Sequence, residues 1–86
     1  MAAQRVLVVE DELLVALDIE SILSEAGMVV VGPASSAGEA LDLIAGSPPD
    51  AALLDANLSG EPITAVAQAL HERAIPFAYV TGYGRE

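Results

Sequence analysis

Four short runs of apolar residues divide the chain, and they predict buried β-strands. They occupy residues 6–9, 28–31, 51–54 and 77–81. Within each run the apolar residues follow one another instead of alternating with polar ones. A strand of a parallel sheet is covered on both faces, so continuous apolar runs are typical of such strands.

Amphipathic segments between these runs predict helices. In residues 13–26, one stripe of the helical surface is apolar, whereas Asp18, Ser21 and Glu25 fall on the opposite face. The stripe consists of Val15, Ile19, Ile22 and Ala26. Gly27 is the expected end of this helix.

Two further helices follow the second and third strands. The segment Ser36-Ala37-Gly38-Glu39 has the pattern of a capping box, and Gly46 with Pro48 marks the end of that helix. Pro62 suits the first turn of the third helix. The expected buried positions of the third helix are Ile63, Val66, Leu70 and Ala74.

The predicted element order is therefore strand, helix, strand, helix, strand, helix, strand. Parallel strands joined by crossover helices give an α/β fold, a three-layer α/β/α sandwich with a central parallel sheet. Ligands of such sheets bind beyond the carboxyl ends of the strands. Candidate chemistry is therefore expected at those ends.

Acidic residues follow two of the strands. Glu10 and Asp11 come directly after the first strand, Asp55 ends the third, and Thr81 ends the fourth. The second strand is expected to end in Gly32-Pro33, which offers no reactive side chain. If the first, third and fourth strands are neighbours, the three carboxylates share one crevice, where their mutual repulsion favours a bound cation. Mg²⁺ is a hard ion that prefers carboxylate oxygens.

Each of these residues also has an ordinary structural explanation. Acids before a helix complement its dipole, and an Asp after a strand often forms a turn. The combination is more specific than its parts. A carboxylate held at a strand end, as Asp55 is expected to be, can act as a nucleophile toward phosphorus. The Thr81 hydroxyl could then donate a hydrogen bond to the phosphoryl group.

Composition narrows the possible partners and classes of site. The net charge is −10, and the bases are three arginines with no lysine, which argues against nucleic acid or anionic lipid as a ligand. There is no cysteine, and the single histidine, His71, is expected on a solvated helix face. No apolar run is long enough for a membrane span, and no signal peptide is recognised, so a cytoplasmic protein is expected.

These residues and their spacing resemble the receiver domain of two-component response regulators. The resemblance rests on residues 5–12, 50–57 and 80–82, and it implies a flavodoxin-like topology. It also implies that Glu10, Asp11 and Asp55 bind Mg²⁺ together with the backbone carbonyl of Asn57. Asp55 would be the phosphoacceptor and Thr81 the switch hydroxyl. The implied partner is a sensor histidine kinase or a phosphotransfer protein, and the domain would catalyse only its own phosphorylation and dephosphorylation.

The chain departs from the family pattern in two respects. A receiver has five βα units and a lysine after the fifth strand, whereas residues 1–86 supply about four units and no lysine. We therefore expect an incomplete receiver domain that lacks the C-terminal βα unit. Its fourth strand would be an exposed edge through which two copies could form a homodimer. Mg²⁺ binding is expected to survive the missing lysine better than the switch does.

Two alternatives to phosphorylation remain open. The first is a degenerate receiver that serves only as a scaffold for protein interaction or dimerisation. The second is a Toprim-like metal nuclease, whose fold also places acids after the first and third strands. Asn57 stands where that nuclease site would need its second acid, and the surface is strongly anionic.

Overall fold

The computed structural model describes residues 3–56, 58 and 63–80, which form a parallel sheet flanked by helices. The strands are β1 (Arg5–Val9), β2 (Val29–Ala34), β3 (Ala51–Asp55) and β4 (Phe77–Val80). The helices are α1 (Leu13–Glu25), α2 (Ala37–Gly46) and α3 (Thr64–Glu72). All strand pairs are parallel, and the strand order is β2-β1-β3-β4.

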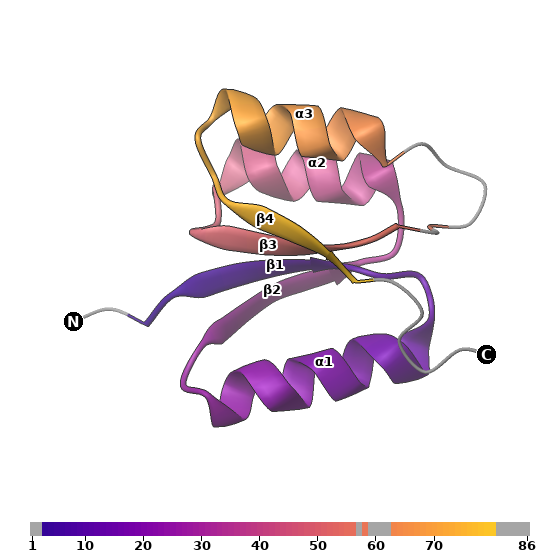
Figure 1. Cartoon of the computed structure of the whole chain (residues 1–86), viewed down its shortest axis with the longest axis vertical. Coiled ribbons are helices and arrows are strands. Elements are labelled where there is room, and N and C mark those ends of the chain that lie inside the picture. Colours follow the sequence, from indigo (N-terminus) through magenta and orange to yellow (C-terminus); the bar gives the residue numbers. More distant parts are fainter. Residues whose placement is uncertain (1–2, 57, 59–62, 81–86) are drawn as a thin grey trace.

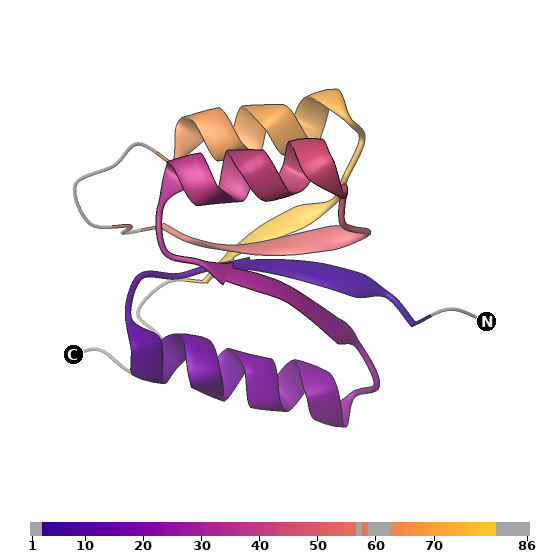
Figure 2. The same ribbon diagram turned by 180° about the vertical axis from the view of Figure 1, so that it is seen from behind.

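The helices cover the two faces of the sheet unequally. α1 packs on one face, and α2 and α3 lie side by side on the other (Figure 1). The reverse view shows the same three layers, with the sheet between α1 and the α2–α3 pair (Figure 2). The predicted α/β/α sandwich is confirmed.

The central strands contribute side chains to both cores. Leu7 and Val9 of β1 pack with α2 and α3, whereas Val8 packs with Val15 and Ile19 of α1. The continuous apolar run of β1 is therefore buried on both faces, as predicted. The expectation fails for β2 and β4, in which several residues are exposed. Each of them has one neighbouring strand among the described residues, so less of its surface is covered.

The buried face of α1 differs from the predicted stripe. Val15 and Ile19 are buried, but Ile22 is 53% exposed and Ala26 is also exposed. Ala16 is buried instead, and Leu23 is half-buried against the α1 core. The helix thus faces the sheet with positions 15, 16, 19 and 23, so the first half of the predicted stripe is correct and the second half is displaced.

The predicted third helix extends further at its C-terminal end than the helix in the structure. Val66 and Leu70 are buried as expected, but Ala74 lies beyond the end of α3, where its φ of 57° is left-handed. Ala74 is exposed, and Ile75 takes the buried position after the helix. Pro62 lies outside the described residues.

β2 continues three residues beyond its predicted end at residue 31. Its pairing with β1 runs from Arg5↔Val29 to Leu7↔Val31 and then skips to Val9↔Ala34. Two steps along β1 thus match three along β2, which is a β-bulge. The extra residue falls in the Gly32-Pro33 segment, where the peptide bond is cis and Gly32 has a φ of +97°.

Candidate functional site

Three carboxylates gather at the carboxyl ends of the two central strands. One ligand atom each from Glu10, Asp11 and Asp55 lies within 4.8 Å of the other two. β1 and β3 are paired with Val9 opposite Leu54. The residues that follow these two, Glu10 and Asp55, therefore lie at the same level of the sheet. The predicted meeting of these acids is confirmed.

Glu10 is held at both its backbone and its side chain. Its amide donates to the carbonyl oxygen of Ala34 at 2.9 Å. Its carboxylate oxygen Oε2 accepts from the amide of Glu12, the residue before α1, at 3.0 Å. The side chain is 4% exposed. Glu10 therefore binds the backbone at the start of α1, as the ordinary structural explanation of an acid before a helix expects. It also contributes a carboxylate to the cluster.

Asp55 is the most deeply placed of the three acids. It is the last residue of β3 and is 2% exposed. The same strand buries Leu54 in the core with α2 and α3, which fixes the backbone from which Asp55 projects. Asp11 is half-buried and lies nearer solvent. A rigid, recessed carboxylate beside two others matches what the sequence predicts for a phosphoacceptor.

Two predicted site residues, Asn57 and Thr81, lie outside the described residues. Their sequence neighbours are placed. Val80, which precedes Thr81, pairs with Asp55 across β3 and β4, and the amide of Ala56 donates to the Val80 carbonyl at 3.5 Å. The end of β4 therefore lies beside Asp55.

The donor set of the cluster fits Mg²⁺. Its three side chains offer carboxylate oxygens, with neither imidazole nor thiolate among them. Such oxygens suit a hard divalent cation, and Mg²⁺ usually keeps several water ligands beside one or two protein carboxylates. A bound cation would also offset the repulsion between acids this close together.

The sequence did not reveal the contribution of β2 to this site. Gly32-Pro33 was expected to end that strand, and this part of the prediction is wrong, because β2 extends to Ala34. β2 passes through the bulge to the buried residue Ala34, whose carbonyl holds the amide of Glu10. A glycine and a proline at a strand end are signals for a bulge, so the feature was recognisable in principle.

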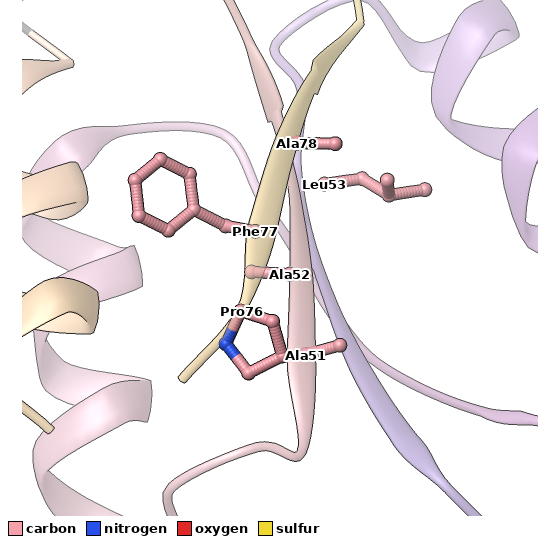
Figure 3. A pocket seen from close by; sticks show the side chains of 6 residues that line it. All are labelled: Ala51, Ala52, Leu53, Pro76, Phe77 and Ala78. Atoms are coloured by element: carbon pink, nitrogen blue, oxygen red, sulfur yellow. The ribbon is translucent and has the colours of Figure 1, made fainter. Parts of the chain in front are cut away.

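An apolar hollow of about 270 Å³ lies at the other end of the strands. It is formed by the first residues of β3 and β4 with Pro76, and Phe77 and Leu53 point away from each other across these strands (Figure 3). Its lining carries no acid: Ala51, Ala52, Leu53, Pro76, Phe77 and Ala78. The hollow is therefore separate from the carboxylate cluster. In the described part of the chain, no helix is long and apolar enough to cross a membrane.

Known proteins resemble this chain in both sequence and structure. The transcriptional regulatory protein PdtaR of Mycobacterium tuberculosis is 30% identical over 83 residues, which span 95% of this chain and 40% of PdtaR. The anti-anti-sigma factor PhyR from Bartonella quintana, solved in complex with the anti-sigma factor NepR, is 34% identical with a TM-score of 0.81. That match covers 90% of this chain and 33% of the PhyR chain.

A third relative has a more similar length. The BeF3-activated conformation of SdrG from Pseudomonas melonis Fr1 is 40% identical, with a TM-score of 0.80 over 95% of this chain and 71% of SdrG. The chain thus spans less than half the length of PdtaR and of PhyR. Residues 6–86 match the response regulator receiver domain. Together with the parallel sheet and its acidic end, this match shows that the chain belongs to the response regulator receiver domain family.

Proposed function

We propose that this chain is a phosphoacceptor module of a two-component system, with Asp55 as the residue that is phosphorylated. The observation that carries the proposal is the clustering of Glu10, Asp11 and Asp55 within 4.8 Å in a receiver fold. The phosphoryl donor would be a phosphohistidine of a sensor histidine kinase or a phosphotransfer protein in the cytoplasm.

The transfer is a displacement at phosphorus. An oxygen of the Asp55 carboxylate attacks, an O–P bond forms, and the P–N bond to the donor imidazole breaks with its electron pair leaving on nitrogen. Mg²⁺, when bound, supplies positive charge to the phosphoryl oxygens. Hydrolysis of the resulting acyl phosphate restores the carboxylate. The module therefore catalyses only its own phosphorylation and dephosphorylation.

The other residues have supporting roles. Glu10 and Asp11, with Asp55 and the backbone carbonyl of Asn57, would hold the cation. The Thr81 hydroxyl would donate to the phosphoryl group. Support for this role of Thr81 comes from its neighbour Val80, which is paired with Asp55.

Beryllofluoride, a phosphoryl mimic, tests this proposal. Amide NMR spectra of the chain with Mg²⁺ should change around Asp55 and Thr81 when beryllofluoride is added. Asp55→Asn should abolish the change. Asp42→Asn is the matched control, because Asp42 is an exposed acid on α2, outside the cluster. A response that persists in Asp55→Asn contradicts the proposal.

The second candidate function is a scaffold that binds a protein without being phosphorylated. It is favoured by the relative PhyR, which is solved in complex with the protein NepR. The absence of any beryllofluoride response in the wild-type chain would support the scaffold. The receiver family match decides against the Toprim-like nuclease alternative.

A further inference from the structure

The bulge in β2 contains Gly32 and sets the position of Ala34, which hydrogen-bonds an acid of the carboxylate cluster. In a regular parallel pair, each step along β1 would meet one step along β2. Here the extra residue between Val31 and Ala34 brings Ala34 opposite Val9. The carbonyl of Ala34 then accepts the amide hydrogen of Glu10 at 2.9 Å. The backbone of a cluster acid is therefore held by a residue that only the bulge places there.

Gly32 is the residue that allows this path. A Cβ atom at position 32 would lie 2.7 Å from the amide nitrogen of Ala34 and 3.2 Å from the carbonyl oxygen of Val8. Both are backbone atoms, so neither can move away by a change of rotamer. The φ of +97° is also one that residues with a side chain rarely adopt. Any other residue must shift the backbone of Ala34 or Val8.

Such a shift would reach the cluster directly. Ala34 holds the amide of Glu10, and Val8 lies on β1, two residues before Glu10. The Glu10 carboxylate also accepts a hydrogen bond from the amide of Glu12, so reorienting it to compensate would cost that bond. Mg²⁺ requires near-ideal octahedral geometry with ligands at about 2.0–2.1 Å, which leaves little tolerance for displacement.

From this geometry we infer that Gly32 is a positioning residue for Mg²⁺ binding. It acts through Ala34 and Glu10 and touches no ligand itself. The inference rests on the proposed function, because it concerns the same cation site. Loss of a group that orients a metal ligand typically weakens affinity by about 10- to 100-fold. We expect Gly32→Ala to weaken Mg²⁺ binding by at least about tenfold.

Gly27→Ala is the matched control. Gly27 also has a positive φ, +85°, but no atom lies within 4 Å of the position where its Cβ would be. It follows α1 at the end remote from the carboxylates. Both substitutions should therefore lower stability through the backbone, and only Gly32→Ala should also disturb the cluster.

The experiment measures two quantities for each 86-residue variant. Mg²⁺ affinity is obtained from a titration followed by amide NMR shifts, and stability from urea unfolding in EDTA. The expected result is a weakened Mg²⁺ affinity in Gly32→Ala and an affinity within about twofold of wild type in Gly27→Ala. Equal affinity in Gly32→Ala and wild type, or equal weakening in both variants, overturns the inference.

A second pair of variants decides the case if Gly32→Ala does not fold. Ala34→Gly loosens the backbone that presents the carbonyl to Glu10, and Ala40→Gly removes another fully buried methyl group from α2. Ala34→Gly should lose Mg²⁺ affinity relative to Ala40→Gly, and equal affinities overturn the inference. Failure of the wild-type chain to bind Mg²⁺ would instead refute the proposed function, so the two failures are distinguishable.

Discussion

At the residue scale, Asp55 combines burial with the proximity of two other acids. It is 2% exposed, and a carboxylate oxygen of Asp55 lies within 4.8 Å of one from Glu10 and one from Asp11. Like charges at this distance repel, and low solvent access weakens their screening by water. The protein keeps an unfavourable arrangement of charge at the point where the proposed chemistry takes place.

Neutralising one of these acids should therefore stabilise the metal-free protein. We expect Asp55→Asn to raise the free energy of unfolding in EDTA by about 1 kcal/mol, since repulsion with Glu10 and Asp11 is reduced. Mg²⁺ at 100 times its dissociation constant should stabilise the wild type by about 2.7 kcal/mol and the variant by less. Urea unfolding with and without Mg²⁺ measures both effects. A less stable variant in EDTA would contradict the expectation.

The side chains of the cluster were predictable from the sequence, and its backbone support was not. The sequence marks three acids as candidates because each lies at the end of an apolar run: Glu10, Asp11 and Asp55. The carbonyl of Ala34 has no signature of its own, since every residue carries one. Only the register of β2 against β1 shows that this carbonyl meets the amide of Glu10.

At the element scale, the start of α2 is stabilised by a network of short polar contacts. The hydroxyl oxygen of Ser36 accepts from the amide of Glu39 at 3.1 Å, which confirms the N-cap half of the predicted capping box. The returning contact goes one residue further back than the usual pattern. Glu39 Oε1 accepts from both the amide and the hydroxyl of Ser35, each at 2.8 Å. These two bonds lower the pKa of Glu39 from its ordinary value of 4.5.

The lowered pKa of Glu39 makes a small part of the stability depend on pH. The folded protein binds the Glu39 proton less tightly than the unfolded chain does, so this contribution is present above pH 4.5 and is lost as the pH falls through the folded pKa. Ser35→Ala should raise the Glu39 pKa part of the way toward its ordinary value, because the hydroxyl bond is lost while the bond from the backbone amide remains. Side-chain NMR titration measures the change. An unchanged pKa would show that the hydroxyl bond does not form in solution.

β3 should tolerate poorly the replacement of a buried side chain by a smaller one. Leu54 is completely buried in the core with α2 and α3, so Leu54→Ala should lower the free energy of unfolding by about 2–5 kcal/mol. Leu14→Ala is the matched control, since Leu14 on α1 is 76% exposed, and its cost should stay below about 0.5 kcal/mol. Urea unfolding compares them. Similar costs would mean that α1 or β3 packs differently in solution.

Periodicity predicted the helices more accurately than it predicted their buried faces. The predicted stripe of α1 included Ile22, yet Leu13, Leu14, Leu17 and Ile22 are all exposed large apolar residues. In a helix with apolar residues on several sides, the pattern cannot tell which of them meets the sheet. That choice depends on the angle at which α1 crosses β1 and β2.

At the scale of the whole molecule, β4 is one of the two edge strands of the sheet among the described residues, and β2 is the other. Tyr79 on this strand is 47% exposed, and its ring packs edge-on against Phe77 with centroids 6.0 Å apart. A strand edge with apolar side chains invites pairing with another strand. The predicted homodimer through this edge stays a prediction.

Sedimentation of the 86-residue chain tests that dimer. We expect a monomer–dimer equilibrium at high protein concentration, shifted toward monomer by Tyr79→Lys, because a charged side chain on an edge strand opposes pairing. Glu72→Lys serves as the control for the change in charge, since Glu72 is exposed at the end of α3. A clean monomer of the wild-type chain would show that this edge does not pair with itself.

The α/β class of the molecule followed from its pattern, whereas the strand order came from the family resemblance. Continuous apolar runs indicate buried parallel strands but do not say which strand lies beside which. The order β2-β1-β3-β4 places the first strand in the interior and the second at an edge. That arrangement is decided by how the crossover helices pack on the two faces.

The interior place of β1 has a consequence for the chain as it is made. β1 leaves the ribosome before β3 does, and Val6 through Val9 pair with residues 51–54, which are synthesised much later. Until then, β1 can pair only with β2, and the edge of this strand that will pair with β3 has no partner. Native pairs so distant in sequence form slowly and leave apolar surface open to other molecules. A nascent chain halted before residue 51 should therefore engage chaperones that recognise extended apolar segments.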